Sequence, residues 1–571
     1  MKIIKSLLPL FVVITLSYWS ISNIFITDFF QVHDNTQVQR VFVMAKSLQD
    51  GIFPVRWVSD LGYGYGYPIF NFYAPLSYYF GATMTLVGFD VLLATKLMMI
   101  FGVLIAGITM YLLGKTLWGK LGGIISALFY VYSPYHAVNA YVRGAVGEFW
   151  AYGLLPLVFY SLLKLIDKFS WKYVVIGAFA YSGIILSHNL FAFMLTPFLL
   201  LFVAIHSFIN RNFIYLFTSV LVIGLGLSSF YILPAVFETK YTNVPSLVGG
   251  GADFRDHFVC PQQLWSSYWG FGGSIAGCID GMSFMLGKLH ILTTIGAFIL
   301  FSSGLIFSSL KLKDKIKKNN VKFAFLTFSL IGLIFSIIMI LNISQFIWEA
   351  IPYMEFLQYP WRFLNFVSFF MAIFAGFFIW WIEHIFKQTR LKNATLAVSV
   401  SVIILLIYAN GKLFTPQASV NVSIKDLVSK ENLSWTTSKI SDEYMPSSFI
   451  KPLSYNEIPD GKISENQHVE VLYEDSNTVQ LHASTKVSVK SNLMLNIAYF
   501  PGWVGYLDNK KIDLREEKRG MSIEIPEGVH SVDLFFVETP IEKLGNSISL
   551  TFLFIVFVGI IFTMKRSRSE R

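Results

Sequence analysis

Asp34 is the first residue of this chain whose type and setting fit catalysis. It follows the first hydrophobic segment, in the run His33-Asp34-Asn35-Thr36-Gln37-Val38-Gln39-Arg40. If residues 34–48 are helical, Asp34, Gln37 and Arg40 lie near one face of that helix. A carboxylate there can act as a general base on a sugar hydroxyl or bind a divalent cation. The spacing fits equally well a helix cap without any catalytic role.

Arg143 and Glu148 form a second candidate group, at the start of a hydrophobic segment at 149–166. Arg143 suits a phosphate, and Glu148 suits a cation or a hydrogen-bond donor. A salt bridge between the two that only fixes the loop explains the pattern equally well. His136, in the preceding Ser-Pro-Tyr-His run, is a further candidate substrate contact.

His188 and Arg362 stand at the boundaries of other hydrophobic segments. A lone histidine such as His188 is more often structural than a substrate contact. Arg362, in the run from Gln358 to Phe363, enters a hydrophobic segment, where an unpaired cation is costly. Its partner must be a carboxylate, an anionic headgroup or the membrane interface, and these alternatives remain open. Gln358 is a candidate contact in the same run.

A glycine- and tyrosine-rich run, Leu61-Gly62-Tyr63-Gly64-Tyr65-Gly66-Tyr67-Pro68, belongs to the same first loop as Asp34 and Asp60. Tyr65, Tyr67 and the later Tyr73 could form an aromatic platform for a sugar ring. From composition alone, an ordinary aromatic belt at the membrane interface is favoured.

The elements that must position these residues are membrane-spanning helices. Of the 571 residues, 54% are hydrophobic and only 14% are charged, whereas a soluble protein carries about a quarter charged residues. Apolar segments long enough to cross a bilayer recur along the chain, and we expect about twelve spans: 6–26, 91–113, 120–133, 149–166, 171–187, 190–208, 213–233, 287–310, 322–342, 361–386, 394–410 and 545–564. The short apolar stretch Pro75–Gly88 is interpreted as an interfacial or re-entrant helix.

The net charge of +9 indicates topology rather than a nucleic-acid partner. The basic residues gather in short loops near 115–120, 164–172, 211, 311–318, 387–392 and 565–571. The positive-inside rule then places both termini in the cytoplasm and the loops 28–79, 133–148, 234–287 and 342–361 outside. Every candidate residue above falls on that outer side.

The section from about 411 to 544 reads as alternating strands separated by turn signals, near 468–473, 479–483, 487–497, 521–525 and 532–536. It predicts an antiparallel β-sandwich on the outer side, before a final span at 545–564. Cys260 and Cys278 both lie in an outer loop, so a disulfide and two unpaired thiols are equally open. Walker, Rossmann, zinc-site and nucleophile-elbow motifs are absent from the sequence.

Taken together, these residues resemble bacterial GT-C-type integral membrane glycosyltransferases, and in particular the "6-pyruvoyl-tetrahydropterin synthase-related" membrane proteins and the related YfhO-type proteins. The resemblance rests on Asp34 in a long first loop, the 62–73 aromatic run, Arg143-Gly144-Ala145 with Glu148, Ser187-His188-Asn189 and the 358–363 run. It extends to Tyr499-Phe500-Pro501-Gly502-Trp503 near the end.

The resemblance implies a mainly α transmembrane bundle of GT-C type at 1–410, the β-sandwich domain at 411–544 and a final span with a basic tail at 545–571. It implies transfer of a sugar from a polyprenyl-phosphate carrier to a glycan, lipid or protein on the outer face of the bacterial cytoplasmic membrane. Asp34 would be the base, with Asp60 and Glu148 as further catalytic acids. Mg²⁺ or Mn²⁺ on Asp34 and Glu148 is left open, because the familiar Asp-x-Asp pair is missing.

The substrate contacts expected on this basis are His33, Gln37, Arg40, Tyr65, Tyr67, Tyr73, His136, Arg143, His188, Gln358 and Arg362. Two other functions compete with sugar transfer from a monophosphate carrier. One is a lipid-linked glycan transporter or a scaffold with a carbohydrate-binding domain. The other is a ligase that uses a diphosphate-linked oligosaccharide.

Overall fold

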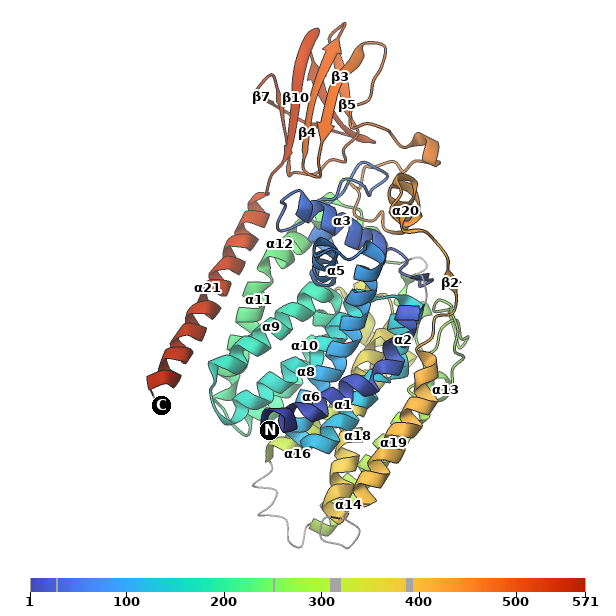
Figure 1. Cartoon of the computed structure of the whole chain (residues 1–571), viewed down its shortest axis with the longest axis vertical. Coiled ribbons are helices and arrows are strands. Elements are labelled where there is room, and N and C mark those ends of the chain that lie inside the picture. The colour runs from blue at the N-terminus through green and yellow to red at the C-terminus, as the bar shows by residue number, and fades with distance from the viewer. Residues whose placement is uncertain (1, 27–28, 250–251, 309–319, 387–393, 570–571) are drawn as a thin grey trace.

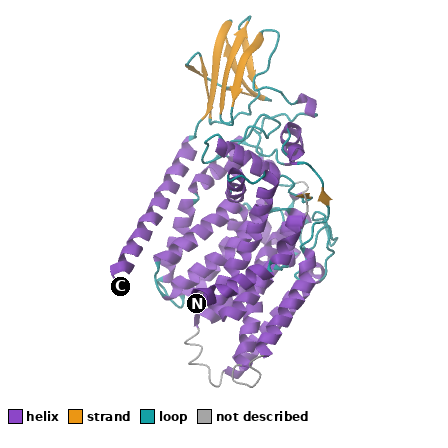
Figure 2. Ribbon diagram, in the orientation of Figure 1, coloured by secondary structure: helices purple, strands orange, loops and turns teal. Residues whose placement is uncertain are grey.

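The protein, seen in a computed structural model, is a helical bundle with β-strands gathered at one end (Figure 1). The structure describes residues 2–26, 29–249, 252–308, 320–386 and 394–569. The basic stretches 311–318 and 387–392 therefore lie outside the described residues. Figure 2 shows that helices make up the bundle and that the sheets stand apart from it, next to the start of the last helix.

The chain is a multi-pass integral membrane protein. Within the described residues, seven helices are long and apolar enough to cross a membrane, or up to nine if two bent helix pairs each count as one span. Two further apolar helices, Trp171–Ser187 and Lys288–Ser302, are shorter than a span. These counts fall below the predicted twelve for two reasons. The predicted segments 171–187 and 287–310 form helices that are too short to count, and the segments 91–113 and 120–133 count together as one helix. The main helices are α1 (Lys2–Leu16), α2 (Tyr18–Ile26), α6 (Val91–Val131), α8 (Val146–Asp167), α9 (Trp171–Ser187), α10 (Asn189–Ser207), α11 (Phe213–Leu227), α12 (Ser229–Phe237), α14 (Lys288–Ser308), α16 (Asn320–Ile340), α18 (Leu364–Phe386), α19 (Ala394–Asn410) and α21 (Pro540–Ser569).

Element α6 is a helical hairpin rather than one long helix. Gly119 breaks it with a φ of 77° and a ψ of −173°, in a region that glycine adopts readily. A methyl group on Gly114 would come within 3.0 Å of Gly123 and 2.9 Å of Ser126, so the two halves pack closely against each other. The predicted division between segments 91–113 and 120–133 therefore agrees with the break at Gly119. The two segments together cover most of the 41 residues of α6.

The first loop folds into three short helices, α3 (Gln37–Gln49), α4 (Ile69–Phe72) and α5 (Leu76–Leu86). The N-cap residue of α3 is Thr36, so the alternative in which Asp34 caps this helix is wrong. Helix α5 corresponds to the apolar stretch Pro75–Gly88. At 11 residues it is only about 16 Å long, too short to cross a bilayer.

The strands near the C-terminus form two antiparallel sheets. One has the order β3-β4-β10-β6-β7 and the other β5-β9-β8. Strand β4 alternates exposed and buried positions, which is the pattern of a sheet with one face on a core. The strands are β3 (Val469–Ser476), β4 (Gln480–Val487), β5 (Ser491–Leu495), β6 (Trp503–Leu507), β7 (Lys510–Ile512), β8 (Arg515–Glu517), β9 (Gly520–Ile525) and β10 (Gly528–Phe536).

The strands of these sheets begin later than the predicted domain boundary at 411. The earlier β2 (Ser419–Val420) pairs instead with β1 (Phe29–Phe30), just before Asp34. Between β2 and β3 the described chain holds only short helices, including α20 (Ile424–Leu427). Residues 411–468 thus pack partly on the first loop, and the proposed 411–544 domain remains a prediction.

Candidate functional site

Glu148 is positioned by an irregular stretch before α8. The chain passes through α7 (Pro134–Ala137) and a π-helix, Val138–Arg143, and then turns at Gly144, which has a φ of 65°. A side chain at Gly144 would collide with Val32 of the first loop. This turn places Arg143 beside the first turn of α8, where Glu148 lies.

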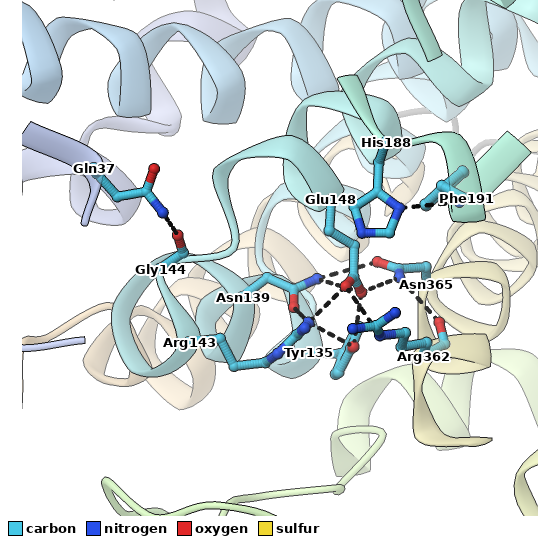
Figure 3. Close-up of polar contacts among 10 residues, drawn as sticks. All are labelled: Gln37, Tyr135, Asn139, Arg143, Gly144, Glu148, His188, Phe191, Arg362 and Asn365. Atoms are coloured by element: carbon cyan, nitrogen blue, oxygen red, sulfur yellow. Dashed lines mark hydrogen bonds and ion pairs between the residues drawn. The ribbon is translucent and has the colours of Figure 1, made fainter. Parts of the chain in front are cut away.

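The Glu148 carboxylate is completely buried and surrounded by donors (Figure 3). Its Oε1 accepts hydrogen bonds from the Tyr135 hydroxyl at 2.9 Å and from Asn365 Nδ2 at 2.7 Å. Its Oε2 accepts one from Arg143 Nη1 at 2.8 Å and lies 3.8 Å from Arg362 Nε. We call Tyr135, Asn139, Arg143, Glu148, Arg362 and Asn365 the Glu148 cluster.

These donors give no support to the catalytic role predicted for Glu148, which stays a prediction. A general base needs a free lone pair directed at the substrate proton, whereas both Glu148 oxygens already accept hydrogen bonds or face a guanidinium. The same contacts make it a poor metal ligand. Among the described residues, no three His, Cys, Asp or Glu side chains form a group that could hold a metal ion. Glu148 instead acts as the counter-charge that positions two arginines.

Aromatic rings lie against both arginines of the cluster. The Arg143 guanidinium lies 4.6 Å from the ring centre of Trp361, and that of Arg362 lies 5.4 Å from the ring centre of Tyr359. The Tyr359 and Trp361 rings stack on each other with centres 4.8 Å apart. Cation–π contacts of this kind are stronger where water is excluded. The run Gln358–Phe363 therefore supplies both a charge and the aromatic surface that holds the charges in place.

Within the cluster, positive charges outnumber negative charges by one, and a further carboxylate, that of Asp34, lies beside Arg143. Two guanidinium groups face one carboxylate. Although Arg362 is only 8% exposed, its Nε and Nη1 have no hydrogen-bond partner among the described residues. Buried donors without partners are rare and costly. An anion bound there would satisfy both the charge and the donors.

Asp34 lies beside the cluster. The backbone N–H groups of His33 and Asp34 donate to the carbonyls of Val142 and Arg143, at 3.0 and 2.8 Å. Burial alone lowers the pKa of Arg143, but Glu148, Tyr135 and Asp34 outweigh this effect and raise it. Asp34 is half-buried, so its carboxylate is accessible while lying next to a buried cation.

Gln37 and Arg40 extend from the cluster into the first loop. Gln37 Nε2 donates to the Gly144 carbonyl at 2.8 Å, and its Oε1 accepts from Tyr78 at 2.7 Å. Arg40 contacts Tyr78 and lies 3.9 Å from the ring centre of Tyr73. Gln37 thus contacts the backbone next to Arg143 without contacting the cluster's side chains, and Arg40 and Tyr73 belong with Tyr78 to a neighbouring group of tyrosines.

His188 lies next to the cluster but acts first as a helix cap. Its Nδ1 accepts the backbone N–H of Phe191 at 3.0 Å, at the start of α10. The pKa of His188 is lowered to about 3, chiefly by burial; Glu148 opposes this shift, and Arg362 and Arg143 contribute to it. It is therefore uncharged at neutral pH.

Other predicted site residues have contacts outside the cluster. Asp60 forms a salt bridge with Lys46 at 2.8 Å, so its predicted catalytic role gains no support. His136 bonds to the Val131 carbonyl and packs on Tyr152. His33 lies edge-on to Phe271. Gln358 occupies a turn with a φ of 62°, directly before Tyr359.

The aromatic-platform prediction is wrong for Tyr65 and Tyr67. Both rings are buried, Tyr65 against Phe449 and Tyr67 against Tyr444 and Ser441. A sugar cannot stack on rings whose faces are already packed. The run instead fastens the first loop to the segment before the strands, through Tyr63 and Asp442 as well.

A second buried polar cluster was not predicted. Arg56 and Asn71 of the first loop meet Glu238, at the end of α12, and Glu542, in the first turn of α21. Asn71 Nδ2 donates to Glu542 at 2.8 Å and to Glu238 at 3.2 Å. Arg56 Nε lies 3.8 Å from Glu542, and Thr539 donates to Glu238. We call these five residues the Glu238–Glu542 cluster.

The salt bridge between Arg143 and Glu148 was one of the two predicted alternatives, but the partners Tyr135, Asn139 and Asn365 were missed. Asn139 lies four residues before Arg143 and Asn365 three after Arg362, so both fall on the same helical faces as the arginines. That spacing was the available signal. Tyr135 offered none beyond its place next to His136.

Residues 70–246 match a family model described as "6-pyruvoyl-tetrahydropterin synthase related domain; membrane protein". The match supports the expected resemblance to this group of membrane proteins over residues 70–246 only. An uncharacterized protein of Lactococcus lactis subsp. cremoris is 25% identical over 215 residues, which are 35% of this chain and 34% of that protein. The chain thus matches about a third of that relative's length.

Solved structures of an archaeal oligosaccharyltransferase from Archaeoglobus fulgidus are also similar. The apo form has a TM-score of 0.48 and 15% identity, over 78% of this chain and 61% of that one. The complex of this enzyme, AglB, with an inhibitory peptide and a dolichol-phosphate has a TM-score of 0.46 and 14% identity, over 79% and 62%. At this level of similarity, no residue role is transferred to the present chain.

Proposed function

We propose that the protein is a GT-C-type membrane glycosyltransferase. It transfers a sugar from a polyprenyl-phosphate carrier to a glycan, lipid or protein on the outer face of the bacterial cytoplasmic membrane. The observation that carries this proposal is the buried Arg362 guanidinium, with Nε and Nη1 unsatisfied among the described residues, in a cluster with one surplus positive charge. A phosphate group supplies both the charge and the acceptor oxygens that this site lacks.

The reaction uses the half-buried Asp34 as the base. An acceptor hydroxyl oxygen attacks the anomeric carbon, its proton passes to Asp34, and the bond from that carbon to the carrier phosphate breaks. The attack comes from the face opposite the phosphate, so the anomeric configuration inverts. Arg362 and Arg143 stabilise the negative charge that develops on the departing lipid phosphate. Glu148 and the rings of Tyr359 and Trp361 hold the two arginines in place.

The site suits an anion better than a cation. Glu148 cannot offer a free oxygen to Mg²⁺ or Mn²⁺, and Asp34 neighbours Arg143. No step of the mechanism therefore passes through a metal ion. The disulfide between Cys260 and Cys278 supports an outer location for the 234–287 loop, because disulfides persist in oxidising compartments. The positive-inside pattern supports the same orientation.

The test uses purified protein in liposomes with polyprenyl-phosphate monosaccharides labelled in the sugar. We expect the wild type to release polyprenyl phosphate and to move the label to a new product or to water. Asp34→Asn should bind the lipid with unchanged affinity but lose turnover by about 10²–10⁴-fold, the usual contribution of a general base. Asp60→Asn is the matched control, because Asp60 lies in the same loop but pairs with Lys46.

Three results would count against this mechanism. Full turnover by Asp34→Asn would exclude Asp34 as the base. Turnover only with diphosphate-linked sugars would indicate the ligase instead. Lipid binding by the wild type without bond cleavage for any sugar tried would favour the transporter or scaffold.

A further inference from the structure

The outer loop closed by the Cys260–Cys278 disulfide exposes an unusual number of large apolar side chains. Of the 21 residues from Pro261 to Gly281, only Asp280 is charged. Five large apolar residues in this loop are exposed: Trp265 (50%), Tyr268 (73%), Phe271 (37%), Ile275 (46%) and Ile279 (60%). A loop that faced only water would present polar side chains instead.

The fold of this loop turns its single charge inward. Asp280 accepts hydrogen bonds from Gln263 Nε2 at 2.8 Å, from the Ser267 hydroxyl at 2.6 Å and from the Tyr268 backbone N–H at 3.0 Å. These bonds and the disulfide hold the loop together without a large apolar core of its own. Its charge is thus used for internal structure, while apolar rings remain outside.

A second segment continues the same surface. Residues 342–353, which include α17 (Gln345–Ala350), expose Ile343, Phe346 and Tyr353. The two segments are joined by a stack of Phe254 on Trp348 and by a salt bridge from Arg255 to Glu349 at 3.1 Å. We call residues 254–281 and 342–353 together the loop platform.

The loop platform is attached directly to a membrane span. The Val259 N–H donates to the carbonyl of Ile340, the last residue of α16. Residues 320–340 contain one of the candidate spans, and the next span begins at Pro360, immediately after the platform. In Figure 1, α13 (Pro261–Trp265) lies at the flank of the bundle, below the strands of the C-terminal sheets.

We propose that the loop platform inserts its exposed rings into the interfacial region of the outer leaflet. The partner of this exposed surface is the lipid bilayer, because the platform is continuous in sequence with two apolar spans. Exposed Trp and Tyr beside aliphatic side chains are also the composition that membrane interfaces favour. Within the loop platform, the acidic side chains Asp256, Asp280 and Glu349 outnumber Arg255, so the insertion depends on apolar burial and not on anionic lipid.

Insertion would also give the Glu148 cluster a lipid-facing side. Phe271 packs edge-on against His33, and His257 packs edge-on against Tyr359, the ring that holds Arg362. The platform thus connects the bilayer surface to the residues beside Asp34 and Arg362. This inference goes beyond the proposed function and stands without it, since it concerns where the loop lies and not which reaction occurs.

The test is a depth measurement by spin labelling in liposomes of zwitterionic lipid. Ser266→Cys and Ala276→Cys place a nitroxide at exposed positions of the loop, and Lys510→Cys, on the exposed edge strand β7, is the control. We expect labels at 266 and 276 to collide more with oxygen, which concentrates in the bilayer, than with a water-soluble nickel complex. The label at 510 should show the reverse.

A matched variant tests the cause. Replacing Trp265, Tyr268 and Ile279 together by serine should move the label at 276 towards the water phase, in zwitterionic lipid at both low and high salt. The proposal is overturned if labels at 266 and 276 favour the nickel complex as strongly as the label at 510. It is also overturned if they broaden one another's spectra between molecules, because the surface would then be an interface between two copies. Neither readout needs turnover, so failure here is distinct from failure of the glycosyltransferase proposal.

Discussion

The two buried polar clusters of this protein have opposite charge balances. The Glu148 cluster sets two guanidinium groups against one carboxylate, whereas the Glu238–Glu542 cluster sets two carboxylates against one guanidinium. Both are closed off from water and both join segments that are distant in sequence. The two clusters differ in whether their excess charge can be neutralised by a change in protonation.

In the Glu238–Glu542 cluster, groups of the protein itself can balance the excess negative charge. Both Nη atoms of Arg56 donate hydrogen bonds, to Asn71 and Phe230 from one and to Asn546 from the other. Burial raises the pKa of Glu238 to about 7, and the neighbouring Glu542 adds to the increase although the Thr539 hydroxyl opposes it. Below about pH 7, a proton on Glu238 therefore neutralises the excess negative charge. This is the behaviour expected of a structural joint between the first loop, α12 and α21.

The Glu148 cluster has no comparable internal solution. A guanidinium group does not lose its proton in a protein, so the extra positive charge cannot be removed by titration; besides a bound anion, the carboxylate of Asp34 next to Arg143 opposes it. Arg362 keeps two N–H groups without partners among the described residues, whereas Arg56 keeps only Nε. The comparison shows that an excess of glutamate can be neutralised by a proton, whereas an excess of arginine cannot; this is why we propose the Glu148 cluster, and not the Glu238–Glu542 cluster, as the anion site.

The largest expected effect comes from making the same substitution in both clusters. Glu148→Gln leaves two buried guanidinium groups without a counter-charge, so we expect it to lower the free energy of unfolding by about 3–5 kcal/mol. Glu238→Gln removes a carboxylate that, with a pKa of about 7, is mostly ionised at pH 8 beside Glu542, so it should leave stability at pH 8 unchanged or higher. Thermal unfolding in detergent micelles measures both. Equal losses at the two sites would refute the proposed difference between the clusters.

The next effect separates activity from stability with a matched pair of arginine variants. Arg362→Met should lower turnover by about 10²–10³-fold, since it removes a donor that acts on the departing phosphate. Arg362→Lys should recover only part of that loss, because lysine keeps the charge but not the planar fork. Turnover is measured as release of polyprenyl phosphate per folded molecule.

Arg56→Met is the control for that experiment. It should reduce stability while leaving turnover per folded molecule unchanged, because Arg56 belongs to the joint and contacts none of the Glu148 cluster in the described structure. If Arg56→Met abolished turnover in a fully folded sample, the two clusters would have to be considered one functional unit.

A smaller effect concerns pH. Because the folded-state pKa of Glu238 is raised to about 7, the folded protein holds a proton that the unfolded chain releases near its ordinary value of about 4.3. Stability from this group is present at low pH and falls as the pH rises through that interval. The melting temperature should therefore fall between pH 5 and pH 7.5 in part through Glu238. In Glu238→Gln this part of the slope should disappear, whereas in Asp60→Asn it should remain.

The sequence predicts the helical segments well and the site only in part. Hydropathy locates the segments, because burial in lipid requires long apolar runs. Arg143 and Glu148 are near neighbours, so their pairing was foreseeable as one of two alternatives. The bond from Asn365 to Glu148 joins residues 217 positions apart, and no local spacing indicates it. The charge surplus that distinguishes the cluster exists only after Arg362 arrives from this distance.

The contacts of the Glu238–Glu542 cluster join residues that are even further apart in the sequence, so local spacing could not predict them either. Asn71 and Glu542 are 471 positions apart, and each looks by itself like an ordinary polar residue at the edge of an apolar segment. Tyr65 and Tyr67 illustrate the converse. Their composition indicated an exposed aromatic surface, yet the segment 441–449 covers them. Which surface a distant segment will cover depends on tertiary packing, which periodicity does not record.

The smallest effect concerns the aromatic rings that lie against the arginines of the Glu148 cluster; among the described contacts, Arg56 of the other cluster has no such ring. Trp361→Leu removes the ring face next to Arg143, a contact that contributes about 0.5–2 kcal/mol where water is excluded. We expect a corresponding loss of affinity for polyprenyl phosphate, measured by displacement of a labelled lipid. Trp361→Phe keeps a ring face and should lose less affinity than Trp361→Leu, although both remove volume. If the two variants lost the same affinity, Trp361 would act through packing alone, and the charges of the cluster would be held by Glu148 without help from the rings.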